Sequence, residues 1–276
     1  MRTYVITGSA SGIGLATAES LRAGGATVIG VDRRDAEVEA DLSTPSGRDK
    51  AVADAVAAAS GSIDAVIACA GVAAPRAVTA SVNYFGMTQF LEGIRPVLAR
   101  SPHPRAVLVS SVSVVHPYHP DLVEALLRDD EAEALAVAGA YEADDPTKSL
   151  IYQSSKRAIG LWLRREAATT AWAGAGIPLN GVAPGLVLTP MTAPLLASEE
   201  GRAKMNASVP TPLNHHQTVQ TIADLLIWLA SEPNTHLCGQ MLFCDGGAEV
   251  VLRGVDAYSF ADATVATVFA NAGAGQ

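Results

Sequence analysis

Short runs of consecutive apolar residues alternate along the chain with longer segments whose apolar positions recur at helical spacing. The short runs predict strands, and most of them contain β-branched residues: "TYVITG", "TVIGVD", "IDAVIACAG", "RAVLVSSV", "IPLNGVAPG" and "GQMLFCDGG". The segments between them predict helices: "LATAESLRAGG", "GRDKAVADAVAAAS", "VNYFGMTQFLEGIRPVLAR" and "TIADLLIWLAS". Apolar strands that alternate with helices are typical of a parallel sheet covered on both faces. We therefore predict a single α/β domain over residues 1–276, a doubly wound, Rossmann-type sheet.

Two segments stand outside this alternation. The first, at about 114–147, carries leucines and a valine at spacings that predict one or two short amphipathic helices: Leu122, Leu126, Leu127, Leu135 and Val137. The second is a C-terminal tail at about 250–276 that includes Tyr258, Phe260 and Phe269. The tail could pack across a partner subunit or be partly disordered, and the sequence leaves both readings open.

Composition narrows the classes of function. The chain has 276 residues, of which 49% are hydrophobic and 17% charged, and its net charge is -9. No basic run is present to neutralise phosphates, so we expect no nucleic-acid partner. The N-terminus resembles no targeting signal, and no apolar run approaches the roughly 18 residues that span a bilayer. We expect a cytoplasmic protein. The three cysteines, Cys69, Cys238 and Cys244, lack metal-ligand spacing, so no metal is predicted.

The stretch "TGSASGIG" follows the first strand and opens the first helix. Gly8, Gly12 and Gly14 have the spacing of a dinucleotide-binding turn, in which glycines allow the backbone to approach a pyrophosphate. Backbone amides at the helix N-terminus, around Ser11 and Ile13, would then face the phosphates.

Asp32 closes the second strand and favours NAD, because a carboxylate there accepts hydrogen bonds from the adenosine ribose and repels a 2′-phosphate. Arg33 and Arg34 follow directly and could hold that phosphate, so NADP remains the less favoured alternative. Asp41 and Leu42 are candidates to meet the adenine, although they would also suit the region that begins a helix.

Tyr152 and Lys156 lie four residues apart in a segment with helical spacing, so they share one helix face. A free phenol has a pKa of about 10 and is a poor base at neutral pH. An ammonium group beside the phenol favours the phenolate, and so does the positive nicotinamide of an oxidised cofactor. Tyr152 could then exchange a proton with an alcohol or a ketone. The alternative is two residues on a helix surface.

The glycine turn, "ACAG", "SVNYFG", "VLVSS", "YQSSK" and "APG" occur in the order found in the short-chain dehydrogenase/reductase family, which the sequence resembles over nearly its whole length. Within that family it is most similar to bacterial 3α-hydroxysteroid dehydrogenase/carbonyl reductases, through "DRRDAEVEADLST", "SVNYFG" and the long interval before Tyr152. The resemblance implies that Tyr152 is the acid/base group, that Lys156 also holds the nicotinamide ribose, and that Asn83 holds a water linking Lys156 to solvent.

The resemblance also implies further contacts. The second serine at the end of the strand, Ser111, would hydrogen-bond the substrate oxygen. It faces away from Ser110 because side chains alternate along a strand, and Ser113 is the fallback. Cofactor contacts are implied for Cys69, Ala70, Gly71, Gly185, Val187 and Thr189. Beyond these, Met191, Leu195, Leu196 and Met205 predict a mobile apolar flap over a greasy substrate, with Met191 and Leu195 as candidate substrate contacts.

The sequence departs from the family pattern at two places. Most members have asparagine where this chain has Cys69, which we interpret as a packing substitution and not as a nucleophile, since no base is placed for a thiol. The interval between Ser111 and Tyr152 is also unusually long, so about 114–147 is an insert. We predict that it caps one side of the substrate cleft and covers a surface that relatives use for subunit contacts. A solvated helical hairpin without a role is the alternative.

These residues favour an NAD-dependent oxidoreductase that interconverts an apolar secondary alcohol, alicyclic, terpenoid or steroid-like, and its ketone. A broad-range, NADPH-preferring carbonyl reductase is the alternative that Arg33 sustains. A catalytically inactive nucleotide-sensing protein is the alternative from another class. The resemblance implies a homodimer or homotetramer, of which the insert favours the dimer. His116 and His119 lack a third metal ligand, and we expect them to line a pocket or the surface.

Overall fold

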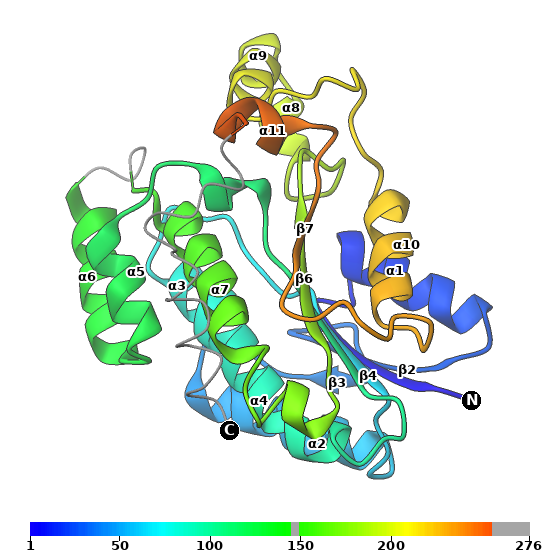
Figure 1. The fold of residues 1–276 in the computed structure, drawn as a ribbon. Coiled ribbons are helices and arrows are strands. Elements are labelled where there is room, and N and C mark those ends of the chain that lie inside the picture. The colour runs from blue at the N-terminus through cyan, green and yellow to red at the C-terminus, as the bar shows by residue number, and fades with distance from the viewer. Residues whose placement is uncertain (145–148, 256–276) are drawn as a thin grey trace, which may run out of the picture.

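Within residues 1–144 and 149–255, which the computed structural model describes, seven strands form one parallel sheet in the order β3-β2-β1-β4-β5-β6-β7 (Figure 1). The strands are β1 (Thr3–Thr7), β2 (Thr27–Asp32), β3 (Val38–Glu39), β4 (Ala65–Ala68), β5 (Arg105–Val109), β6 (Leu179–Pro184) and β7 (Met241–Cys244). The chain leaves β1 in one direction to form β2 and β3, and returns to the other side for β4 to β7. The predicted doubly wound α/β fold is confirmed, and only the two-residue strand β3 was not expected.

Helices cover both faces of the sheet, as the apolar strands require. On one face α1 (Gly12–Ala23) packs beside α10 (Val219–Leu229), and on the other lie α2 (Pro45–Ala58), α4 (Gly86–Leu98) and α7 (Ile151–Glu166) (Figure 1). Separate apolar clusters fill the two sides of the sheet. None of the helices in the described residues is long and apolar enough to cross a membrane.

One predicted helix is interrupted. The segment that begins "SVNYFG" enters through α3 (Val78–Ala80), widens into a π-helical turn over Ser81–Phe85, and continues as α4. π-helical turns occur frequently at functional sites, because the extra residue in the turn redirects a side chain. This turn carries Asn83 and Val82.

The insert forms two helices, α5 (Pro120–Leu127) and α6 (Glu131–Asp144), which pack against each other, and α5 packs on α7 (Figure 1). Leu122 and Leu126 are fully buried in this contact. The buried guanidinium of Arg48, on α2, forms an ion pair with Glu131 at the start of α6. The insert is therefore part of the packed domain and is not a solvated hairpin.

A flap made of α8 (Ala193–Leu196) and α9 (Glu199–Ser208) lies with α11 (Ala248–Arg253) beyond the carboxyl end of β7 (Figure 1). A short 3-10 helix, Val112–Val115, follows β5, and a second, Ala173–Ala175, follows α7. The tail aromatics Tyr258, Phe260 and Phe269 fall outside the described residues.

Candidate active site

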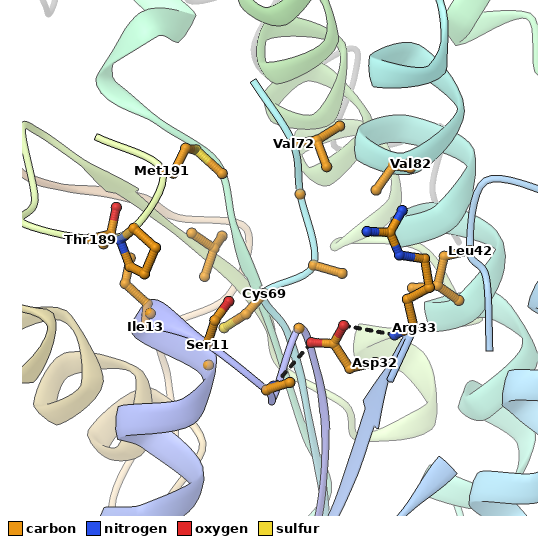
Figure 2. A pocket seen from close by; sticks show the side chains of 18 of the residues that line it. Ser11, Ile13, Asp32, Arg33, Leu42, Cys69, Val72, Val82, Thr189 and Met191 are labelled. Atoms are coloured by element: carbon orange, nitrogen blue, oxygen red, sulfur yellow. Dashed lines mark hydrogen bonds between the residues drawn. The ribbon is translucent and has the colours of Figure 1, made fainter. Parts of the chain in front are cut away.

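A cavity of about 500 Å³ opens at the carboxyl ends of the strands, beside the junction of β1 and β4 where the strand order reverses (Figure 2). Ligands of doubly wound sheets bind at this kind of junction. All the residues predicted to contact a cofactor line it: Gly8, Ser11, Gly12, Ile13, Gly14, Asp32, Arg33, Asp41, Leu42, Cys69, Ala70, Gly71, Tyr152, Lys156, Gly185, Val187 and Thr189. Ser111 and Met191 line it too. Their individual roles remain predictions.

The glycine turn is built for close backbone packing. Gly8 has a φ of +71°, and a Cβ there would lie 2.9 Å from the backbone of Ala70, at the end of the neighbouring strand. A Cβ on Gly14 would lie 2.1 Å from the carbonyl oxygen of Gly8. A side chain at either position would therefore force the turn or α1 to shift. With these glycines, the N-terminus of α1 faces an open cradle that fits a pyrophosphate.

Asp32 is held in place at the end of β2. One carboxylate oxygen accepts a hydrogen bond from the amide of Ala10 at 3.0 Å, and the other accepts one from the amide of Arg33 at 2.7 Å (Figure 2). The first bond ties the acid to the glycine turn, so its position relative to the cradle is set by the backbone. A carboxylate at this place fits the ribose of a dinucleotide.

The side chain of Arg33 extends away from the Asp32 carboxylate, toward Leu42 and Val82 (Figure 2). Asp41 lies at the same end of the cavity. Its pKa is held below the usual value, mainly by hydrogen bonds from Ser43 and to a lesser extent by the positive charge of Arg33. The arginine that could hold a 2′-phosphate therefore does not extend toward the Asp32 carboxylate, and it adds positive charge in the neighbourhood of Asp41.

Lys156 is buried on α7, with 4% of its surface exposed. Its Nζ donates a hydrogen bond to the carbonyl oxygen of Val109 at 3.0 Å and lies 5.9 Å from the centre of the Tyr152 ring. Burial lowers the pKa of Lys156 to about 8, and the nearby Cys69 opposes this shift. Burial also raises the pKa of the Cys69 thiol to about 12, so this thiol is not a nucleophile at neutral pH.

The pKa of Tyr152 lies above its ordinary value, because burial disfavours the phenolate, and the hydroxyls of Ser111 and Ser113 offset part of this rise. The spacing of Tyr152 and Lys156 predicts a lowered pKa for the phenol, but in the protein alone burial has the larger effect and raises it. The phenolate needs additional positive charge or donors before it can act as a base.

The three serines after β5 have different environments. Ser110 donates a hydrogen bond to the carbonyl oxygen of Lys156 at 3.0 Å, which joins β5 to α7. Ser111 lines the cavity, and its hydroxyl accepts a hydrogen bond from the amide of Ser113 at 3.2 Å, capping the 3-10 helix. Ser113 was expected at the end of a strand but lies inside this helix, because the strand ends at Val109.

Asn83 does not line the cavity. Its amide nitrogen donates to the carbonyl oxygen of Val72 and to the hydroxyl of Ser155, each at 3.0 Å, and its oxygen accepts from the amide of Val72 at 2.8 Å. A Cβ added to Gly71 would lie 3.3 Å from Asn83 Oδ1 and 3.4 Å from Lys156 Nζ. Asn83 thus lies beside the buried lysine and fixes the loop after β4. The water that it was expected to hold is a separate prediction.

The loop after β6 is organised by Thr192, which the sequence analysis did not single out. Its hydroxyl donates to the carbonyl oxygen of Val187 at 2.6 Å and accepts a hydrogen bond from the amide of Thr189 at 3.0 Å. Leu195 is 46% exposed and does not line the cavity, so its contact with a substrate stays a prediction that needs movement of the flap. Its neighbour Leu196 turns inward instead, since α8 presents that position to the apolar cluster below the flap.

An apolar cluster fills the space between the flap and the 3-10 helix: Val112, Val115, Leu186, Leu196, Met205, Val209, Phe243 and Ala248. The ring of His116, at the end of this helix, donates a hydrogen bond from Nε2 to the carbonyl oxygen of Ser208, in the flap, at 3.0 Å. The flap and residues 112–116 therefore close this side of the site. Val115 and His116, at the start of the insert, take part in this closure, whereas neither α5 nor α6 contributes a residue to the cavity lining, so the two insert helices do not cap the cleft as predicted.

The histidines of the insert have structural neighbours. His119 stacks on Tyr141, with ring centres 3.4 Å apart. Among residues 1–144 and 149–255 no group of three or more metal-ligating side chains comes together.

Several cavity residues gave no sequence signal, among them Val72, Val82 and Thr192. Val82 reaches the cavity from the π-helical turn, and Thr192 from an irregular loop. An alternation of apolar and polar positions predicts neither conformation.

Comparisons with known proteins agree with this geometry. Residues 2–200 match the family described as short chain dehydrogenase. The chain is 36% identical to the 3-alpha-hydroxysteroid dehydrogenase/carbonyl reductase of Comamonas testosteroni, over 92% of this chain and 98% of the relative. It is 30% identical to a coniferyl-alcohol dehydrogenase of a Pseudomonas species, over 89% and 96% of the two chains. A crystal structure of the 3-alpha-hydroxysteroid dehydrogenase from Pseudomonas sp. B-0831 complexed with NADH superposes with a TM-score of 0.83, at 37% identity over 94% of this chain and 100% of the other.

Proposed function

The chain belongs to the short-chain dehydrogenase family, and from this premise we propose that it is an NAD-dependent oxidoreductase that interconverts an apolar secondary alcohol and its ketone. The observation that carries the proposal is the meeting of Tyr152, Lys156 and Ser111 at the end of a cavity that begins at the glycine turn. An acid/base group beside a dinucleotide cradle is what alcohol oxidation requires.

When bound, the nicotinamide ring would supply the hydride acceptor or donor. The chain's own residues handle the proton and the orientation of the substrate. Ser111 hydrogen-bonds the substrate oxygen, and Tyr152 takes its proton in oxidation or returns it in reduction. Lys156 adds positive charge beside the phenol, and its bond to Val109 fixes its position. The flap and the apolar cluster below it exclude water from the reacting atoms.

We assign NAD over NADP on the position of Asp32. Its carboxylate is held at the cradle by the amides of Ala10 and Arg33, and a 2′-phosphate there would meet a fixed negative charge. The side chain of Arg33 extends away from the Asp32 carboxylate, toward Leu42 and Val82 (Figure 2), so it does not lie where the ribose would meet Asp32. A carbonyl reductase that prefers NADPH is the alternative, and it requires Arg33 to turn toward the ribose. The relative solved with NADH is consistent with the first assignment.

The substrate assignment rests on the apolar surroundings of Ser111. Val112 and Leu186 are nearly fully buried beneath the flap, with Met205 and Phe243 packed against them. These residues support the site from below the flap, while Val72, Val187 and Met191 give the cavity itself an apolar lining, which suits a hydrocarbon skeleton with one secondary alcohol, alicyclic, terpenoid or steroid-like. The relatives point to two subclasses, because one is named for a hydroxysteroid and the other for coniferyl alcohol, which is a primary allylic alcohol.

We also propose a homo-oligomer, with a dimer favoured over a tetramer. The insert helix α5 packs on α7, and α6 packs on α5, so a partner subunit cannot pack directly on the part of α7 that α5 covers. Light scattering of the purified protein measures the mass directly. A stable tetramer would contradict the favoured assignment, and a monomer would contradict both.

The test of function is absorbance at the nicotinamide band with NAD and, separately, NADP. The panel of alcohols comprises cyclohexanol, a monoterpenol, a 3α-hydroxysteroid and coniferyl alcohol. We expect turnover with NAD and at least one secondary alcohol. Turnover with NADP alone would establish the alternative cofactor.

The variant Tyr152→Phe distinguishes the enzyme from the alternative function, an inactive nucleotide-binding protein. An enzyme loses turnover in this variant and keeps NAD binding by calorimetry. A binding protein shows no turnover in either form and binds NAD equally well in both. The presence of Tyr152, Lys156 and Ser111 at one cavity favours the enzyme.

A further inference from the structure

We propose that Ser113 is a second hydroxyl donor to the Tyr152 phenol and stabilises its phenolate form, so that two serines and not one serve the acid/base group. This inference rests on the proposed function of Tyr152 as the proton-transferring residue. It adds a residue that neither the motif nor the comparisons assign to the site.

The first observation is an unused polar group. Ser113 is 5% exposed, and its buried hydroxyl oxygen has no hydrogen-bond partner among the described residues. An unsatisfied buried hydroxyl is unfavourable, because it has lost its hydrogen bonds to water and gained none in the protein. Native proteins satisfy nearly all such groups, and exceptions often have a catalytic role. A short adjustment toward Tyr152, or a deprotonated Tyr152, would satisfy this one.

The second observation is the conformation of the segment. The strand ends at Val109, and the chain enters a 3-10 helix that packs against α7, the helix that carries Tyr152. The hydroxyl of Ser111 is engaged by the amide of Ser113, which fixes the turn between the two residues. The 3-10 helix packs on α7, the helix of Tyr152, and the hydroxyls of both serines favour the ionised form of the Tyr152 phenol. On a continued strand, Ser111 and Ser113 would be two residues apart along the strand and could not both meet one atom as closely.

The chemistry gives the two serines different tasks. During oxidation Ser111 must hydrogen-bond the substrate oxygen, and the amide of Ser113 already donates to it. The Ser111 hydroxyl is therefore shared between the substrate oxygen and other groups when the phenolate forms. Ser113 has no other partner and can donate its proton to the phenolate oxygen throughout the step. Burial raises the pKa of Tyr152, so a donor that remains with the phenolate lowers the barrier to using it as a base.

Other titratable groups lie around the Tyr152 phenol, and their influence on the pH profile must be separated from that of Ser113. Lys156 lies on the same helix, Cys69 at the end of β4, and His116 at the end of the 3-10 helix. Lys156, with a pKa of about 8, titrates in the range where alcohol oxidation is measured. The test therefore compares variants of one hydroxyl, and leaves these three groups unchanged.

The experiment is the pH profile of kcat/KM for alcohol oxidation, from pH 6 to 11, in the wild type, Ser113→Ala and Ser113→Thr. We expect the apparent pKa of the ascending limb to rise by about 0.4–1 pH unit in Ser113→Ala, the shift that corresponds to one hydrogen bond, and to return toward the wild-type value in Ser113→Thr. Below that pKa the rate should fall by about 3–10-fold.

A structural role predicts a different result. If the hydroxyl were only a buried polar atom, Ser113→Ala would keep the wild-type profile and melt at the same or a higher temperature, and that outcome would overturn the proposal.

The phenol is also titrated directly. Ultraviolet difference spectra of the NAD complex, with Tyr152→Phe subtracted, report the Tyr152 phenolate without turnover. An upward shift of the Tyr152 pKa in Ser113→Ala supports the proposal. An unchanged pKa overturns it, even if no alcohol on the panel reacts. Loss of all turnover in the wild type would count against the proposed function, and the spectral titration would still decide the role of Ser113.

Discussion

The Nζ of Lys156 donates a hydrogen bond to the carbonyl oxygen of Val109 at 3.0 Å, so the buried lysine ties α7 to the last residue of β5. This contact satisfies one of the three ammonium protons inside the domain. Burial nevertheless lowers the pKa of Lys156 from 10.5 to about 8, which means that the folded protein holds this proton less strongly than the unfolded chain.

Replacing the lysine should therefore change how stability depends on pH. Between about pH 8 and 10.5 the unfolded wild-type chain binds more protons than the folded one, so wild-type stability rises with pH across this window relative to Lys156→Met. From pH 7 to 10 the difference in unfolding free energy should move in favour of the wild type, on the order of 2 kcal/mol. Urea unfolding of both proteins at the two pH values measures it. A difference independent of pH would show that the pKa is not depressed.

The two bonds to the Asp32 carboxylate lead to a test of cofactor choice. Asp32→Asn keeps an oxygen that can accept from the amide of Ala10 but removes the negative charge. We expect kcat/KM with NAD to fall and kcat/KM with NADP to rise, so that the preference for NAD decreases by about 10–100-fold. Asp49→Asn, an exposed acid on α2, is the matched control and should leave the ratio unchanged. An unaltered ratio in Asp32→Asn would mean that another group selects the cofactor.

Parts of the site that depend on local sequence were predictable. Gly8 and Asp32 lie within a strand, turn and helix that are adjacent in the chain, so spacing alone places them at one cradle. Tyr152 and Lys156 share a helix face for the same reason. The fold class follows from the alternation of apolar strands and helices, and the sheet confirms it.

Other parts depend on tertiary packing and were not predictable. The direction of the pKa shift of Tyr152 is set by burial, which no spacing reveals. Val82 enters the cavity through a π-helical turn, whose single extra residue leaves no periodic signal. The insert was assigned to the cleft because loops there often determine specificity. Its buried leucines instead bind it to α7, and the flap closes the site.

The ion pair between Arg48 and Glu131 should anchor the insert. The Arg48 side chain is 2% exposed, and Glu131→Gln would leave its charge buried without a carboxylate. We expect a loss of about 3–5 kcal/mol in unfolding free energy, measured by urea unfolding. Glu133→Gln, on the same helix, removes the exposed partner of Arg128 and should change stability little, because both groups are solvated. Equal effects of the two variants would show that the pair at Glu131 does not anchor the insert.

Cys69 should be dispensable for chemistry. Its thiol has a pKa of about 12, so iodoacetamide at pH 7.5 should label it in the native protein far more slowly than after unfolding, as peptide mass spectrometry can follow. Cys69→Ala should keep turnover within about threefold of the wild type, whereas Tyr152→Phe should lose about 10²–10⁴-fold. A loss in Cys69→Ala as large as that in Tyr152→Phe would give the thiol a catalytic role.

The bond from His116 Nε2 to the carbonyl oxygen of Ser208 joins the end of the 3-10 helix to the end of the flap helix α9. Burial lowers the pKa of His116, so the ring is neutral at pH 7 and its Nε2 proton makes the bond. His116→Ala removes this link while the apolar cluster under the flap remains. We expect faster amide hydrogen exchange in α9 and a several-fold higher KM for an apolar alcohol, with a smaller change in kcat, because the flap would spend more time open.

His216→Ala is the matched control, since His216 bonds to Asn206 on the same helix and does not reach the 3-10 helix. If both variants raise hydrogen exchange in α9 equally, the effect comes from the helix itself. A change confined to His116→Ala would show that the bond between His116 and Ser208 keeps the flap closed.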